Sequence, residues 1–327
     1  MESITHDRIA LFADNAQAIK KGFTWHNTMT RRLAAFLYAQ VDKPVDGEYI
    51  RQCYMLMKQN TGLFSMFRGN MAICVAAMLS LSEDPQKQFD ETLKVYEMLK
   101  VEKLRASDYL AVAAYIIAEQ VKPGYQQDAV TRTRAFYDIM KKRHYFTTGQ
   151  DDYIYAAMLG LSELEAASGM KRVGQFYDRL KNEFWDKNSV QALSHVLVLG
   201  GSDDSSAARV VELRNAFRAR RIRLDKSFTL PALGILALLP VETETIVQSI
   251  YQMQKSLREQ RGFSKWSVSA QELLLYAVAL VTDEYLDSED KGIVSATIST
   301  GVTGIIIAME VALIVTIAAA SAAAASS

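Results

Sequence analysis

The sequence predicts an all-α protein built from tandem pairs of helices. Apolar residues recur at helical spacing, as at Val173, Phe176 and Leu180, and no alternating pattern long enough for a strand is present. Only 5 prolines and 16 glycines occur in 327 residues, so long helices can run without interruption. The same two-helix unit returns about every 40 residues, which is typical of helical repeats.

Each unit pairs an apolar helix with an amphipathic one. Residues 151–161 are apolar and Ala-rich, whereas residues 173–184 place their apolar side chains on one side. A helix that is apolar all round should be buried on several sides, and an amphipathic one should line the outside. The apolar members begin near Arg68, Ala106, Gln150, Ser189, Phe228 and Val268.

The N-terminal part fits the same scheme. Residues 7–21, 28–40 and 49–59 have helical periodicity. Asp46 is a candidate N-cap, and Asp84 followed by Pro85 has the order of a cap and a first-turn proline.

Two-layer helical arrays are either rings of hairpins or open superhelices. About six or seven hairpins fit into this length, a number that can close a ring. We therefore expect an α/α toroid, with an open α-solenoid as the alternative. The repeat domain should cover residues 1–290, and residues 291–327 should form an apolar C-terminal helix and an Ala/Ser-rich tail.

The tail allows two interpretations. The stretch from Gly301 to Ala320 has about the 20 residues that cross a bilayer, and Glu310 is its one charged residue. It could be a membrane anchor, or a helix docked in the protein's own core, which we favour. A docked Glu310 would need a partner or a raised pKa.

Composition narrows the function classes. Lys plus Arg and Asp plus Glu both number 37, so the chain lacks the basic excess of a general nucleic-acid binder. Cys53 and Cys74 lie in apolar helical runs and indicate buried free thiols, with no metal site and no cofactor motif. No signal peptide is visible, so we expect a cytoplasmic protein, or one attached to a membrane through its C-terminal helix.

Polar residues at the starts of the apolar helices are the candidates for chemistry. Asp108, Asp151 and Asp152 could act as general acid and base, with His144 in the preceding loop. The simpler interpretation, which we favour, is that the acidic residues cap their helices. His195, in an apolar helix, is expected to be a hydrogen-bonded core residue.

The loops that lead into the apolar helices carry aromatic residues. Each aromatic could plug the junction between neighbouring units, which we favour, or line a binding surface. The candidate ligand- or partner-binding residues are Arg68, Phe67, Trp266 and Tyr153, and the further loop aromatics are Phe64, Tyr145, Phe146, Trp185, Phe228 and Phe263.

A basic run lies between residues 209 and 226. It indicates a solvated face with ion pairs to Glu212 and Asp225, or a surface for phosphates or anionic lipid.

Residues 23–25, residues 60–65, Arg68-Gly69 and the Ala/Ser-rich end resemble an uncharacterised bacterial family of unknown function, over the whole chain. The resemblance implies no activity. We therefore expect a non-catalytic helical-repeat protein that binds an unknown protein or small molecule through one end or the concave face. The alternatives are a toroid enzyme, hydrolase- or lyase-like with loop carboxylates at a central pocket, and a tail-anchored membrane adaptor.

Overall fold

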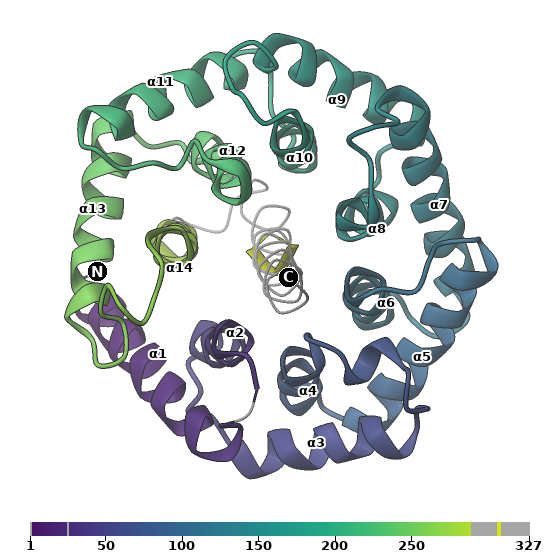
Figure 1. Ribbon diagram of the computed structural model, residues 1–327. Helices are drawn as coiled ribbons and strands as arrows, with labels where there is room; N and C mark the ends of the chain where they lie inside the picture. Colours follow the sequence, from purple (N-terminus) through teal and green to yellow (C-terminus); the bar gives the residue numbers. More distant parts are fainter. Residues whose placement is uncertain (1, 25, 289–305, 309–327) are drawn as a thin grey trace, which may run out of the picture.

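The computed structural model describes residues 2–24, 26–288 and 306–308, and all regular structure within them is helical. The predicted all-α class is confirmed. Figure 1 shows two concentric layers of helices. The outer helices are α1 (Glu2–Gly22), α3 (Gly47–Gln59), α5 (Pro85–Val101), α7 (Gln126–Arg143), α9 (Ala166–Leu180), α11 (Ser206–Ala219) and α13 (Thr243–Glu259). The inner helices are α2 (Thr28–Gln40), α4 (Ala72–Leu81), α6 (Asp108–Gln120), α8 (Tyr153–Leu161), α10 (Lys187–Leu199), α12 (Leu230–Leu238) and α14 (Ala270–Ser288).

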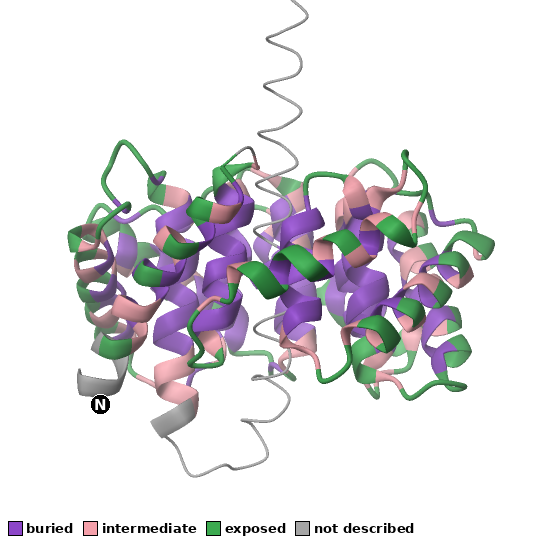
Figure 2. Ribbon diagram, turned by 90° about the horizontal axis from the view of Figure 1, so that it is seen from below, coloured by how far each residue is buried: buried purple, intermediate pink, exposed green. Residues whose placement is uncertain are grey.

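Apolar periodicity decides which layer a helix occupies. Every residue of α4 from Ala72 to Ser80 is buried, as a helix that is apolar all round requires. In α5 the buried residues form a single stripe instead: Phe89, Thr92, Val95, Tyr96 and Leu99. Figure 2 shows this contrast between the inner and outer layers.

Local signals set several helix ends as the sequence predicts. Asp46 accepts a hydrogen bond from the Tyr49 backbone N–H at 2.9 Å, and Asp84 accepts one from the Lys87 N–H at 3.0 Å, with Pro85 in the first turn. Cys53 and Cys74 are buried and are not joined in a disulfide.

The loops gather at the two ends of the array (Figure 2). We call the end that carries the loops from outer to inner helices the front end; it faces the viewer in Figure 1. The loops from inner to outer helices lie at the back end. Three short 3-10 helices lie in front-end loops: η1 (Met66–Arg68), η2 (Gln150–Asp152) and η3 (Ser227–Thr229). All inner helices therefore begin at the front end.

The first and last helix pairs are in contact. Arg32 of α2 donates two hydrogen bonds to Glu272 of α14, at 2.5 and 2.8 Å, and both side chains are buried. Phe12 of α1 packs its ring edge-on against Phe263 and Tyr276, with centroids 4.9 Å apart in each case. Residues 240 or more positions apart thus share one core.

Most of the expected C-terminal helix, including Glu310, lies outside the described residues. Of the stretch from 301 to 320, only Ile306, Ile307 and Ala308 are described, and they are 1%, 4% and 3% exposed. Figure 1 shows them at the centre of the inner helices, in the position that a docked helix requires. None of the helices in the described ranges is both long and apolar enough to span a membrane.

Candidate functional site

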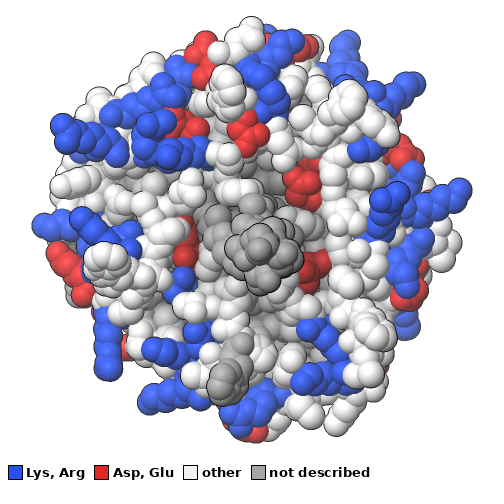
Figure 3. All heavy atoms as spheres, viewed as in Figure 1, with Lys and Arg blue, Asp and Glu red and all other residues white. Residues whose placement is uncertain are grey.

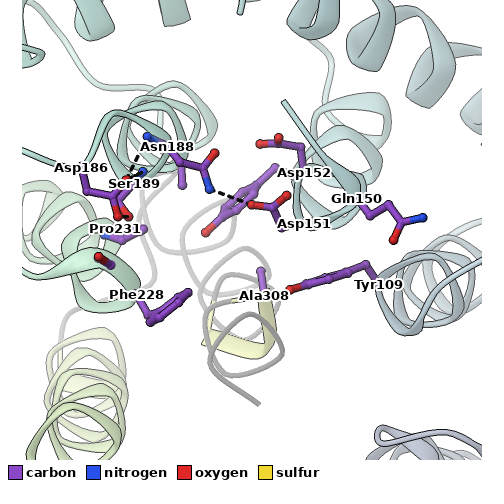
Figure 4. A pocket seen from close by; sticks show the side chains of 13 residues that line it. Tyr109, Gln150, Asp151, Asp152, Asp186, Asn188, Ser189, Phe228, Pro231 and Ala308 are labelled. Atoms are coloured by element: carbon purple, nitrogen blue, oxygen red, sulfur yellow. Dashed lines mark hydrogen bonds between the residues drawn. The ribbon is translucent and has the colours of Figure 1, made fainter. Parts of the chain in front are cut away.

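A pocket of about 480 Å³ opens among the front-end starts of α6, α8, α10 and α12. Its size is within the usual range for small-molecule sites. Ala308 of the C-terminal segment completes its wall. Figure 4 shows the lining side chains converging from these separate elements. They are Tyr109, Gln150, Asp151, Asp152, Tyr155, Asp186, Asn188, Ser189, Ala192, Ser227, Phe228 and Pro231.

The acidic pair of η2 supplies two carboxyls in different settings. Asp151 accepts a hydrogen bond from the Asn188 side chain at 2.8 Å, so it links η2 to α10. Asp152 is 2% exposed and accepts from the Gly149 N–H at 2.9 Å and from the Gln191 side chain at 3.3 Å. Burial, and then the charge of Asp151, raise the pKa of Asp152 well above its usual value.

Asp186 is the third carboxylate of the pocket. It caps α10 by accepting from the N–H groups of Asn188 and Ser189, at 3.1 and 3.3 Å, and from the Ser189 hydroxyl at 2.9 Å. Burial acts to raise the pKa of Asp186, but hydrogen bonds from Ser227 and Ser189 outweigh it, so the net pKa is lowered. Asp186 is therefore held ionised.

Aromatic rings form the rest of the wall. Tyr109 of α6 and Phe228 of η3 lie on either side of Ala308 (Figure 4), and Tyr155 of α8 also lines the pocket. Burial, and then the charge of Asp151, raise the pKa of Tyr109, so its hydroxyl stays protonated at neutral pH. Among the described residues, neither Lys nor Arg lines this pocket. The site therefore offers carboxylate acceptors beside aromatic faces.

The capping interpretation of the acidic residues holds for Asp152 at η2, where it accepts from the N-cap Gly149 N–H, but not for α6 and α8. Ser107, not Asp108, caps α6, and Asp152 makes no side-chain cap to α8. Asp108 lies outside the pocket lining, where Asn70 donates to one of its oxygens at 3.5 Å and the other oxygen is buried without a hydrogen-bond partner among the described residues. Burial raises the pKa of Asp108.

His144 and Tyr153 are not part of the pocket lining. His144 ends α7 and packs against the ring of Tyr177, with centroids 4.3 Å apart. Burial, and then the charge of Arg143, lower its pKa. Tyr153 is buried, packs against Tyr137 and accepts a hydrogen bond from the Arg105 N–H at 3.0 Å, so it fastens the loop before α6.

The three remaining candidates, Arg68, Phe67 and Trp266, differ in their contacts and exposure. Arg68 donates to the carbonyls of Lys58 and Thr61 and so holds its own loop together. Phe67 is 1% exposed and stacks edge-on with Phe89, so it cannot meet a partner. Trp266, by contrast, is 99% exposed.

Six of the loop aromatics fall into two classes. Phe67 and Phe263 are buried, as the plug interpretation requires. Phe64, Phe146, Trp185 and Trp266 are 94%, 97%, 98% and 99% exposed, so that interpretation is wrong for them.

Sequence reasoning missed Asp186, Asn188 and Tyr109 as site residues. Their common signal is position, because each lies at the start of an apolar repeat member, as Asp151 does. Aligning the repeats on those starts would have placed all of them at one end of the array.

The structure thus defines a class: an all-helical, two-layer repeat protein with an acidic pocket at the front end of its inner helices. Residues 15–312 match the model of a family described as "Protein of unknown function (DUF4003)", and the chain belongs to that family. The resemblance to a family of unknown function is therefore confirmed. The chain is also similar to the uncharacterized protein YeaA of Bacillus subtilis (strain 168), with 22% identity over 237 residues, 71% of this chain and 70% of that protein. No solved structure matches it.

Proposed function

We propose that this chain is a non-catalytic binding protein whose front-end pocket takes a small organic cation. The observation that carries the proposal is the lining: Asp151 and Asp186 face a space of about 480 Å³ that Tyr109 and Phe228 flank. Carboxylates pair with ammonium groups through charge-assisted hydrogen bonds, and aromatic faces attract cations. An anionic ligand would meet repulsion from the same carboxylates.

Calorimetric titration of the full chain tests this proposal. The probes are putrescine and choline, with 1,4-butanediol and butyrate as uncharged and anionic comparisons. We expect the cationic probes to bind and the two comparison compounds not to bind. The affinity for the cation should fall about tenfold or more in Asp151→Asn, because a hydrogen bond to a charged group is lost. Asp138→Asn is the matched control, because Asp138 is an exposed carboxylate of α7 that pairs with Arg134. Equal affinity in wild type and Asp151→Asn would refute the assignment.

We further infer that the array is the α/α toroid predicted from the sequence, rather than an open solenoid. The buried Arg32–Glu272 pair supports this, because it joins the first and last inner helices. A cytoplasmic location stays a prediction from the sequence.

An enzyme is the second candidate, favoured by one observation. Asp152 and Asp186 line the same pocket with pKa values shifted in opposite directions, which is the usual arrangement of a general acid and a general base. If a bound amine is converted, NMR of the mixture shows a product, and Asp152→Asn abolishes conversion while binding remains. A bound amine recovered unchanged removes this candidate.

A further inference from the structure

Four fully exposed aromatic side chains project from four separate front-end loops. Phe64 lies between α3 and α4, Phe146 between α7 and α8, Trp185 between α9 and α10, and Trp266 between α13 and α14. The back-end loops carry one comparably exposed aromatic, Tyr125, among the described residues. Transfer of such side chains from water to an apolar environment is favourable, so their exposure indicates an interaction surface.

The front-end loops also carry exposed cations. Figure 3 shows the front end, where Lys and Arg project around much of the outer edge. The exposed front-end cations include Lys103, Arg105, Arg221, Arg223, Lys226, Arg261 and Lys265. The back-end loops instead expose mainly carboxylates: Asp42, Asp46, Glu83, Asp84, Glu163, Glu165, Asp203, Asp204 and Glu242. Among the described loop residues, the exposed charges are thus mainly basic at the front end and mainly acidic at the back end.

Helix dipoles alone do not account for this distribution. Cations are favourable beyond the C-terminus of an outer helix, but each front-end loop also precedes the N-terminus of an inner helix, which favours anions. Some front-end cations form ion pairs within the protein. Arg218 and Arg223 both pair with Asp225, and the sequence predicts ion pairing for Asp225. Lys265, beside Trp266, has no such role in the described hydrogen bonds.

We propose that the front end docks on an anionic lipid bilayer through an aromatic–basic face, defined by Phe64, Phe146, Trp185 and Trp266 with the front-end cations named above. Tryptophan and other aromatics are favoured at the level of lipid headgroups, and Lys and Arg are attracted to anionic lipid. The separation of the aromatics over four loops favours a bilayer over a protein partner. A bilayer accepts separate side chains without matching pockets, whereas the hot spots of protein interfaces cluster at the centre.

Tryptophan fluorescence of the full chain tests the proposal. The vesicles contain phosphatidylglycerol and phosphatidylcholine, with bromine on the acyl chains as a quencher. We expect a blue shift and quenching, both reduced by added salt and absent with phosphatidylcholine alone. Trp185→Phe with Trp266→Phe should keep vesicle binding but lose most of the quenching. Trp185→Ser with Trp266→Ser should weaken binding by about tenfold or more.

Tyr125→Ser, at the back end, is the matched control and should bind as the wild type does. Vesicle binding that leaves Trp185 and Trp266 unquenched would overturn the proposal, because the chain would then attach through another segment, such as residues 301–320. Absence of vesicle binding, or capture of a protein by the same four aromatics without vesicle binding, would overturn it as well.

Discussion

Asp152 and His195 are buried next to each other, yet they do not form an ion pair. The Asp152 Oδ1 and His195 Nδ1 atoms are 3.9 Å apart, too far for a hydrogen bond, and neither ring nitrogen has a hydrogen-bond partner among the described residues. Burial, and then the charge of His144, lower the pKa of His195 to about 3. His195 is thus a neutral core residue, but the expected hydrogen bond is absent.

The two residues should give opposite pH dependences of stability. The folded pKa of His195 lies below its unfolded value of about 6.5, so its contribution is present above about pH 6.5 and is lost as pH falls toward about 3. As pH falls between these two values, the free energy of unfolding of the wild type should decrease by up to about 1.4 kcal/mol per pH unit relative to that of His195→Leu. The folded pKa of Asp152 is raised, so its contribution is present below about pH 4 and is lost as pH rises, relative to Asp152→Asn. Urea unfolding at several pH values measures both slopes, and parallel curves for wild type and either variant would contradict that assignment.

At the scale of the helix, arginines of the outer layer fasten the ends of inner helices. Arg132 of α7 donates to the carbonyls of Gly160, Ser162 and Leu164, where α8 ends. Arg209 of α11 does the same for Leu239 and Val241 after α12. The last carbonyls of a helix lack partners within it, so a guanidinium that reaches several of them satisfies acceptors that would otherwise be unpaired.

Removing one of these arginines should therefore cost more than an ordinary surface change. Arg132→Ala should lower the free energy of unfolding by about 2–3 kcal/mol, because charged hydrogen bonds are lost and carbonyls are left unpaired. Arg132→Lys should cause a loss between that of Arg132→Ala and zero, since an ammonium group lacks the planar set of N–H donors by which a guanidinium reaches several carbonyls. Lys171→Ala, an exposed change on α9, is the control and should stay within about 0.5 kcal/mol of wild type. Chemical denaturation of the three variants measures the series, and equal losses in Arg132→Ala and Lys171→Ala would refute the role.

At the scale of the whole molecule, one buried ion pair joins the two ends of the chain. Arg32 and Glu272 have 8% and 2% of their side chains exposed. Taking both charges out of water costs nearly as much as their attraction returns, so such a pair fixes which elements meet more than it adds stability. Its position between α2 and α14 makes it a determinant of how the array ends.

A double-mutant cycle tests this role. Arg32→Met alone should lower the free energy of unfolding by about 3–5 kcal/mol, because Glu272 is left as a buried charge without its guanidinium. Arg32→Met with Glu272→Leu should recover most of that loss, since apolar side chains can pack in the same space. Denaturant unfolding measures the cycle. A double variant as unstable as Arg32→Met would show that the cost does not come from the stranded carboxylate.

The sequence by itself determined the helices and their division into buried and half-exposed members, because burial on one face or all round is written in local spacing, as in residues 72–80 and 85–101. It also identified Asp151 and Asp152, but favoured helix capping over a place in a pocket for them. Only the tertiary structure decided that they meet Asp186, Asn188, Tyr109 and Phe228 in one pocket, and that Phe67 is buried while Trp266 is exposed. The physical reason is that a pocket depends on the distance between residues of different repeats, which is set by the packing of whole helices and not by any local pattern.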